Sequence, residues 1–190
     1  MRENKLLIKL VVVTETFFFG SLLLAFVYFS LAPGFRAQQL AALDLRTTGL
    51  FTLLLFASSF TYARAEASYR RGAAGGVKGW LLATIGLGGA FLVGQAREFR
   101  GLFARHIDLA SNTFGTSFFT LTGFHGLHVL VGLIVLGILA AMAFAGDFDR
   151  DRPNSSVLSA VGIYWHFVDV VWAVVFSVVY VLPHFTHFGS

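Results

Sequence analysis

Five ionisable side chains lie well inside otherwise apolar stretches of the chain. They are Glu15, His125, His128, His166 and Asp169. An ionisable group in hydrocarbon is costly unless it is paired, neutral or turned into the interior of a helix bundle. Carboxylates and imidazoles can ligate a metal ion, relay protons or join helices through hydrogen bonds. These residues are therefore the candidate site.

A metal site is the most specific chemical interpretation of these five residues. His125 and His128 are three residues apart and share one face of a helix. With His166 and Glu15 they would offer donors that suit iron, copper or zinc. However, the sequence has no Glu-x-x-His pair of the kind that helical di-iron proteins use. We therefore favour a structural hydrogen-bond network, with a proton relay as an open alternative.

Five apolar stretches are expected to position these side chains. They cover residues 6–31, 47–63, 79–96, 113–145 and 157–182. A helix needs ~20 mainly apolar residues to cross a bilayer, and the second and third stretches only just meet this length. The sequence predicts an all-α membrane protein, a bundle of five transmembrane helices that forms a single domain over residues 1–190.

Depth along the predicted helices groups the candidate residues. At ~1.5 Å per residue, Glu15 and His166 lie roughly 13 Å from the inner edge of the membrane and His128 roughly 12 Å. These three are expected to form one polar cluster in the inner half of the bundle. His125 and Asp169 fall near the midplane and form a second expected pair.

The composition excludes several classes of protein. Of 190 residues, 56% are hydrophobic and only 13% are charged, whereas soluble domains carry about 25% charged residues. Disorder, a nucleic-acid-binding module and an ordinary cytosolic enzyme are thereby excluded. The chain has no cysteine, which excludes disulfides, iron–sulfur clusters and a cysteine-bridged copper centre.

The distribution of Lys and Arg predicts the orientation in the membrane. With the N-terminus inside, nine of these residues lie on the inner side and five on the outer side. The inner set is Arg2, Lys5, Lys9, Arg64, Arg70, Arg71, Lys78, Arg150 and Arg152, and the outer set is Arg36, Arg46, Arg97, Arg100 and Arg105. We therefore expect a cytoplasmic N-terminus and an external C-terminus.

Four short motifs extend the interpretation beyond composition. They are TETFFF at 14–19, QAREF at 95–99, FFTLTGFHGLHV at 118–129 and YWHFVDVVW at 164–172. Together they resemble, in the same order, the motifs of subunit III of heme–copper terminal oxidases, and the resemblance covers nearly the whole chain. Two secondary site residues follow from it, Glu98 in the second motif and Trp172 in the last.

The resemblance implies an integral-membrane subunit without a redox centre or catalytic residues of its own. Heme and copper are expected in the partner, subunit I, which carries the oxygen chemistry. Subunit III of this family packs on subunit I, binds phospholipid and supports proton uptake and stable turnover. Subunit II and a small subunit IV are further candidate partners, and no nucleic acid is expected. The expected location is the bacterial plasma membrane, and the chain corresponds to the last five helices of the seven-helix mitochondrial form.

Two alternatives remain open on the sequence. The first is an accessory subunit of a nitric oxide reductase, a related complex with the same helix pattern. The second is an independent membrane metalloenzyme or proton channel. Electron donor and acceptor are determined by other subunits, so this chain does not separate an oxidase from a nitric oxide reductase.

Overall fold

Long helices make up the protein. The computed structural model describes residues 2–33, 35, 39, 42–110, 112–148 and 155–185, and these contain no β-strand. The helices are α1 (Arg2–Ser30), α3 (Leu45–Arg70), α4 (Ala74–Ala104), α5 (Thr113–Phe144) and α6 (Ser155–Phe176), with the π-helical turn η1 (Ser177–Val181) and the short α7 (Leu182–Phe185) after α6. The prediction of an all-α protein is confirmed for the described residues.

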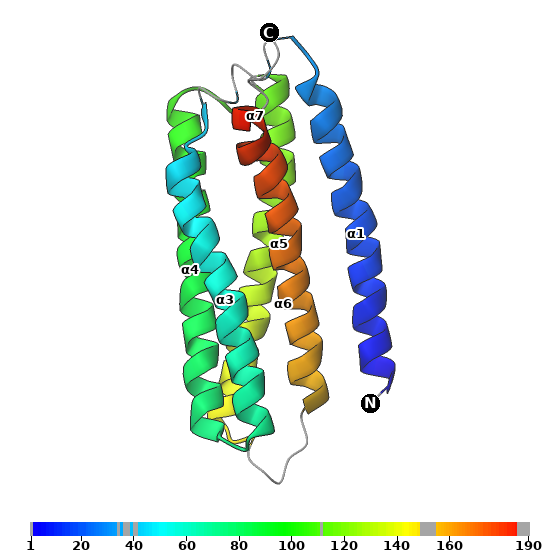
Figure 1. The fold of residues 1–190 in the computed structure, drawn as a ribbon, viewed down its shortest axis with the longest axis vertical. Helices are drawn as coiled ribbons and strands as arrows, with labels where there is room; N and C mark the ends of the chain where they lie inside the picture. The colour runs from blue at the N-terminus through cyan, green and yellow to red at the C-terminus, as the bar shows by residue number, and fades with distance from the viewer. Residues whose placement is uncertain are drawn as a thin grey trace.

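The five long helices run side by side along the longest axis of the molecule (Figure 1). On one side, α1 packs against α5 and α6. On the other side, α3 and α4 form the most extensive contact between any two helices. The α7 end of the bundle lies opposite the N-terminus of α1 (Figure 1).

Within the described ranges, four helices are long and apolar enough to cross a membrane. These segments are Leu7–Ser30, Ala74–Ala104, Thr113–Phe144 and Ser156–Val181. The chain is therefore a membrane bundle, although α3 was also expected to span. With 26 residues α3 is long enough, but many buried hydroxyl groups lower its apolar character, among them Thr48, Thr52, Ser58 and Thr61. Arg36, Arg150 and Arg152, which we counted for orientation, lie outside the described residues.

Glycines bring α4 and α5 close to α6 around one tryptophan. The Trp165 side chain is fully buried, and a Cβ atom at Gly88 or Gly132 would lie 2.9 or 2.8 Å from its ring. The indole Nε1 donates to Ser58 Oγ at 3.1 Å. Trp165 therefore joins four helices in one packing unit, and only glycine leaves room for its ring at these two positions.

The end of α6 departs from regular α-helix at η1. Pro183 has no backbone N–H, so the carbonyl group of Val179, four residues earlier, loses its usual helical donor. The side-chain amide of Gln39 donates to this Val179 oxygen instead. A residue from the segment between α1 and α3 thus satisfies a buried carbonyl group at the end of the last long helix.

Asp44 caps the N-terminus of α3. Its carboxylate accepts hydrogen bonds from the Thr47 hydroxyl and from the backbone N–H groups of Arg46 and Thr47. These bonds, the Thr47 hydroxyl above all, hold the pKa of Asp44 below its ordinary value of 3.8. A carboxylate with a lowered folded-state pKa contributes stability at neutral pH and loses it as the pH falls through that pKa.

Replacing Asp44 with alanine is expected to lower the free energy of unfolding by about 1 kcal/mol at pH 7. The loss should shrink below about pH 4, where the wild-type carboxyl group also becomes protonated. Asp44→Asn is the matched control, because an amide oxygen still caps a helix well. Thermal unfolding of the purified protein at pH 7 measures the effect, and equal midpoints for Asp44→Ala and wild type would contradict it.

Candidate functional site

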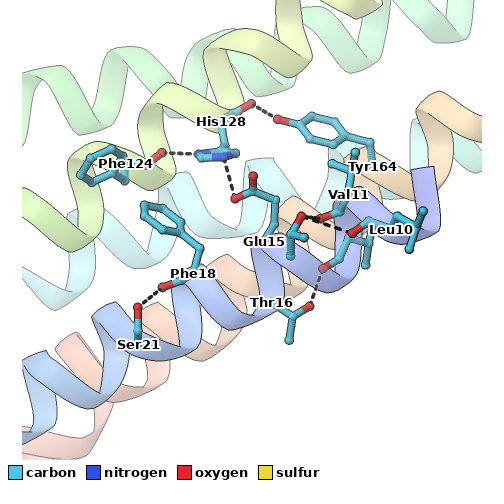
Figure 2. Close-up of polar contacts among 11 residues, drawn as sticks. Leu10, Val11, Glu15, Thr16, Phe18, Ser21, Phe124, His128 and Tyr164 are labelled. Atoms are coloured by element: carbon cyan, nitrogen blue, oxygen red, sulfur yellow. Dashed lines mark hydrogen bonds and ion pairs between the residues drawn. The ribbon is translucent and has the colours of Figure 1, made fainter. Parts of the chain in front are cut away.

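Glu15 and His128 form an ion pair between α1 and α5. Glu15 Oε2 lies 3.1 Å from His128 Nε2, and the side chains are 27% and 18% exposed. Figure 2 shows Glu15 pointing from α1 toward the imidazole ring of His128 on α5. The other ring nitrogen, Nδ1, lies 2.7 Å from the backbone oxygen of Phe124. Both imidazole nitrogens are therefore engaged.

The hydrogen bonds of His128 determine where its protons lie. A carbonyl oxygen only accepts, so Nδ1 must carry a proton toward Phe124. One further proton then lies between His128 Nε2 and Glu15 Oε2, on either the imidazole or the carboxyl group. In both arrangements the net charge of the pair is zero. A pair of this kind places two ionisable groups within the bundle without a net charge in the apolar region.

Aromatic side chains flank His128 in this pair. The Phe19 ring centroid lies 4.9 Å from that of His128 at a steep angle, and Phe18 lies 6.3 Å away. From α6, the Tyr164 hydroxyl donates to the backbone oxygen of His128 at 3.1 Å, as Figure 2 also shows. The pair is thus the point where α1, α5 and α6 meet.

A second polar group joins α3 to α6. The Ser59 hydroxyl donates to Asp169 Oδ2, and its oxygen lies 2.8 Å from His166 Nδ1. A serine has one hydroxyl proton, so when it donates to Asp169 it accepts from His166 Nδ1–H. The three groups form a continuous hydrogen-bonded chain from imidazole to carboxylate.

His125 lies in an aromatic box and belongs to neither group. It is fully buried, and its ring is stacked on Trp172 with centroids 4.7 Å apart. The rings of Phe91 and Phe19 approach it edge-on, at 5.9 and 6.4 Å. Among the described residues, neither ring nitrogen has a hydrogen-bond partner.

Both secondary residues bond to α3. Glu98 accepts from the Thr48 hydroxyl at 3.0 Å and from the Tyr180 hydroxyl at 2.7 Å. Trp172 Nε1 donates to Thr52 Oγ1 at 3.0 Å. Glu98 therefore connects α3, α4 and η1 at the end of the bundle where α3 begins.

The arrangement differs from the grouping expected from depth. Glu15 and His128 do come together, but His166 bonds to Ser59 rather than joining them. His125 stacks on Trp172 rather than forming a hydrogen bond with Asp169. In place of one cluster and one pair, the structure has two bonded groups and an enclosed histidine. No group of three or more potential ligands in the described part of the chain could hold a metal ion.

Sequence reasoning missed the hydroxyl groups of α3. They connect α3 to three neighbouring helical segments, and a signal for them was present in the sequence. Hydroxyl side chains recur along an otherwise apolar stretch, so that most of them fall on one face of a helix. The row consists of Thr48, Thr52, Ser58, Ser59, Thr61 and Tyr62. Thr61 bonds Thr84 of α4 at 2.8 Å.

Fold and site together define an integral-membrane helical bundle whose ionisable groups join its helices. The model of the family "Cytochrome c oxidase subunit III" matches residues 2–184. The chain therefore belongs to the cytochrome c oxidase subunit III family, and the expected resemblance is confirmed. It is an accessory subunit of a heme–copper terminal oxidase, part of an oxidoreductase complex.

Curated relatives support the same assignment. "Cytochrome c oxidase subunit 3" of Synechocystis sp. is 35% identical over 92% of this chain and 74% of the relative. "Probable cytochrome c oxidase subunit 3" of Mycobacterium leprae is 34% identical over 88% of this chain and 82% of the relative. "Cytochrome bo(3) ubiquinol oxidase subunit 3" of Pseudomonas aeruginosa is 38% identical over 69% of this chain and 62% of the relative. The relatives thus include subunits of oxidases named for cytochrome c and for ubiquinol.

Proposed function

We propose that this chain is a helper subunit that packs on subunit I of a bacterial plasma-membrane oxidase and sustains its proton uptake and turnover. Heme and copper belong to subunit I, and subunit II, a small subunit IV and phospholipids are further partners. The chain forms one domain over residues 1–190 and contributes no redox centre. Its own residues act by holding a helical surface in a fixed shape within the membrane.

The Glu15–His128 pair carries this proposal. It lies at the junction of α1, α5 and α6, and it places ionisable groups in the bundle at zero net charge. The engaged Nδ1 of His128 fixes the orientation of the imidazole ring toward Glu15. A group held in this way supports a structural role, because both of its hydrogen-bonding atoms are already used within the chain.

We also propose that α3 is the fifth transmembrane helix. Its hydroxyl groups bond to neighbouring helices or to backbone carbonyl groups of α3 itself, whereas its outer face is apolar. Leu50, Leu53 and Phe60 are each about 60% exposed, at 59%, 64% and 63%. A helix with polar atoms inward and apolar side chains outward suits a bundle surrounded by lipid. With α3 counted as a span, the distribution of Lys and Arg gives a cytoplasmic N-terminus and an external C-terminus.

A pull-down of the tagged chain from native membranes tests the proposed function. We expect it to co-purify with a large subunit, and the complex to show a heme absorption spectrum. An assay of whether the complex oxidises cytochrome c or a quinol identifies its electron donor. Recovery of the chain alone, or stoichiometric metal bound to it, would instead favour an independent metalloenzyme. A complex that reduces nitric oxide and not oxygen would favour the reductase.

A further inference from the structure

Four polar side chains lie along the contact between α3 and α6, which run side by side (Figure 1). They are Ser59 and Glu66 of α3 and His166 and Asp169 of α6, and we call them the polar seam. Ser59 bonds both α6 residues, and Glu66 is so close to α6 that a Cβ atom at Gly162 would lie 3.0 Å from its Oε1. Asp169 is 5% exposed, whereas Ser59, Glu66 and His166 are half-buried and reach the surface of the subunit.

The polar seam holds hydrogen-bond acceptors that the described part of the chain does not satisfy. Because Ser59 donates to Asp169, His166 donates from Nδ1 to Ser59, and Nε2 of the neutral ring is then an acceptor. This Nε2 has no partner among the described residues. Glu66 forms neither a hydrogen bond nor an ion pair there, although Arg70 lies one turn further along α3. Asp169 Oδ1 is buried without a partner.

These acceptors lie among apolar surroundings at the level of the membrane interior. His166 and Asp169 belong to the candidate span Ser156–Val181, with Asp169 near its middle. Large apolar side chains flank the polar seam, since Phe56 of α3 is 39% exposed and Val170 of α6 is 62% exposed. Acyl chains carry no hydrogen-bond donor, so lipid alone would leave partly exposed ionisable groups unsatisfied, which is costly. The polar seam therefore requires cover by protein.

The chemistry of the polar seam selects among possible partners. A second copy of this chain would present the same acceptors, so two such seams in contact would lack donors. The ammonium group of a lipid headgroup stays at the membrane boundary, roughly 13 Å from His166. A transmembrane helix of another subunit can carry hydroxyl, amide, indole or cationic donors to that depth. Ala63, exposed on α3 one turn after Ser59, leaves room for such a helix to approach closely.

We propose that a transmembrane helix of the large, heme-bearing subunit docks on the polar seam and donates hydrogen bonds to His166 Nε2 and to the Glu66 carboxylate. Phe56 and Val170 border this contact, and Ala63 lies at the point of closest approach. The inference rests on the proposed function, which packs the chain on that subunit. It adds which face of the chain makes the contact and which chemistry the facing helix must carry.

Site-specific photo-crosslinking in the purified oxidase complex tests the location of the contact. We expect the photoactivatable residue p-benzoylphenylalanine, placed at Ala63, to form a crosslink to the large subunit that mass spectrometry identifies. Ala57 is the matched control, because it is also exposed on α3 but lies about 120° around the helix from Ala63. It should give no such crosslink. A crosslink from Ala63 to a second copy of the chain, to a small subunit or to nothing would overturn the proposal.

A bulky substitution at the same position gives an independent readout. Ala63→Trp should lower the ratio of large subunit to tagged chain after co-purification about tenfold, because overpacking at a close contact costs on the order of a factor of ten in affinity. Ala57→Trp makes the identical change away from the polar seam and should leave the ratio unchanged. Both alanines are exposed, so neither tryptophan enters the interior of the subunit.

Substitutions of Glu66 test the hydrogen bonds rather than the fit. Glu66→Leu removes the acceptor and should lower the same ratio about tenfold, the loss for one hydrogen bond to a charged group. Glu66→Gln keeps an oxygen that accepts from the same donor and should stay near the wild-type ratio. A wild-type ratio for Glu66→Leu would show that the large subunit donates no hydrogen bond to this carboxylate.

The wild-type complex separates failure of this inference from failure of the proposed function. Recovery of a heme-bearing large subunit with the wild-type chain supports the proposed function, whatever the variants do. Wild-type ratios for both Ala63→Trp and Glu66→Leu would then overturn the docking face alone. Recovery of the wild-type chain without a large subunit would overturn both. The midpoint of thermal unfolding of each full-length variant checks that the subunit keeps its fold.

Discussion

Replacing Glu15 with leucine is expected to destabilise the subunit by about 1–3 kcal/mol, because it leaves His128 Nε2 without its partner inside the bundle. The same loss is expected from His128→Leu, which leaves the Glu15 carboxyl group unpaired. The double variant Glu15→Leu/His128→Leu removes both groups of this partly buried pair together, and apolar replacement of both members of an ion pair is often nearly neutral. The midpoint of thermal unfolding of the purified complex measures all three.

This double-mutant cycle measures the coupling energy between Glu15 and His128 apart from their contacts with other residues. Tyr164 bonds to the backbone oxygen of His128, so that contact should persist in every variant. If the double variant is as unstable as the sum of the single variants, the two side chains are not coupled and the structural role proposed for the pair is wrong.

Glu15→Gln probes the shared proton rather than the packing. With Nδ1 protonated toward Phe124, the neutral His128 ring can accept at Nε2 from the amide N–H of glutamine, but the amide cannot exchange a proton with the ring. We therefore expect a small loss of stability and a shorter period of sustained turnover, with unchanged heme content. Loss of heme in Glu15→Gln would show that the pair acts on the assembly of the redox centres.

The sequence predicted the helices, and the depth of each ionisable residue along them, better than it predicted the hydrogen-bond partners of these residues. The rise per residue placed Glu15 and His128 at one level, and the structure joins them. Depth does not fix the direction in which a side chain points around its helix. His166 was therefore assigned to Glu15, whereas it turns toward α3 and bonds Ser59. The partner was overlooked because a serine does not ionise and so was not among the candidate residues.

The same limitation explains His125 and α3. His125 and Asp169 were paired by depth, but Trp172, one turn beyond Asp169, presents a larger surface and stacks on the imidazole ring.

In α3, the mean hydropathy averages the apolar outer face with the hydroxyl-bearing inner face. Only the identity of the neighbouring helices shows that Thr52 and Ser58 are satisfied by indole N–H groups, and one sequence does not contain that information.

Gly94→Ala is expected to disturb the contact between α3 and α4, the most extensive in the bundle. A Cβ atom at Gly94 would lie 2.4 Å from Cγ of Phe51 and 2.5 and 2.6 Å from its two Cδ atoms. These atoms are at the base of the ring, so a small rotation of a flexible end cannot relieve the clash. Either the Phe51 side chain changes its χ1 rotamer or the helices separate. Overpacking of this kind costs about 1–3 kcal/mol.

The matched control for this clash is Gly86→Ala on the same helix. A Cβ atom at Gly86 meets nothing within 4 Å, so alanine there should be neutral or stabilise α4 by up to about 1 kcal/mol through its higher helix propensity. The two substitutions are chemically identical, and the difference between their unfolding midpoints therefore isolates the contact with Phe51. Adding Phe51→Ala to Gly94→Ala should recover part of the loss, since the smaller side chain makes room for the new methyl group. Equal midpoints for Gly94→Ala and Gly86→Ala would show that α3 and α4 do not approach each other as closely as the structure places them.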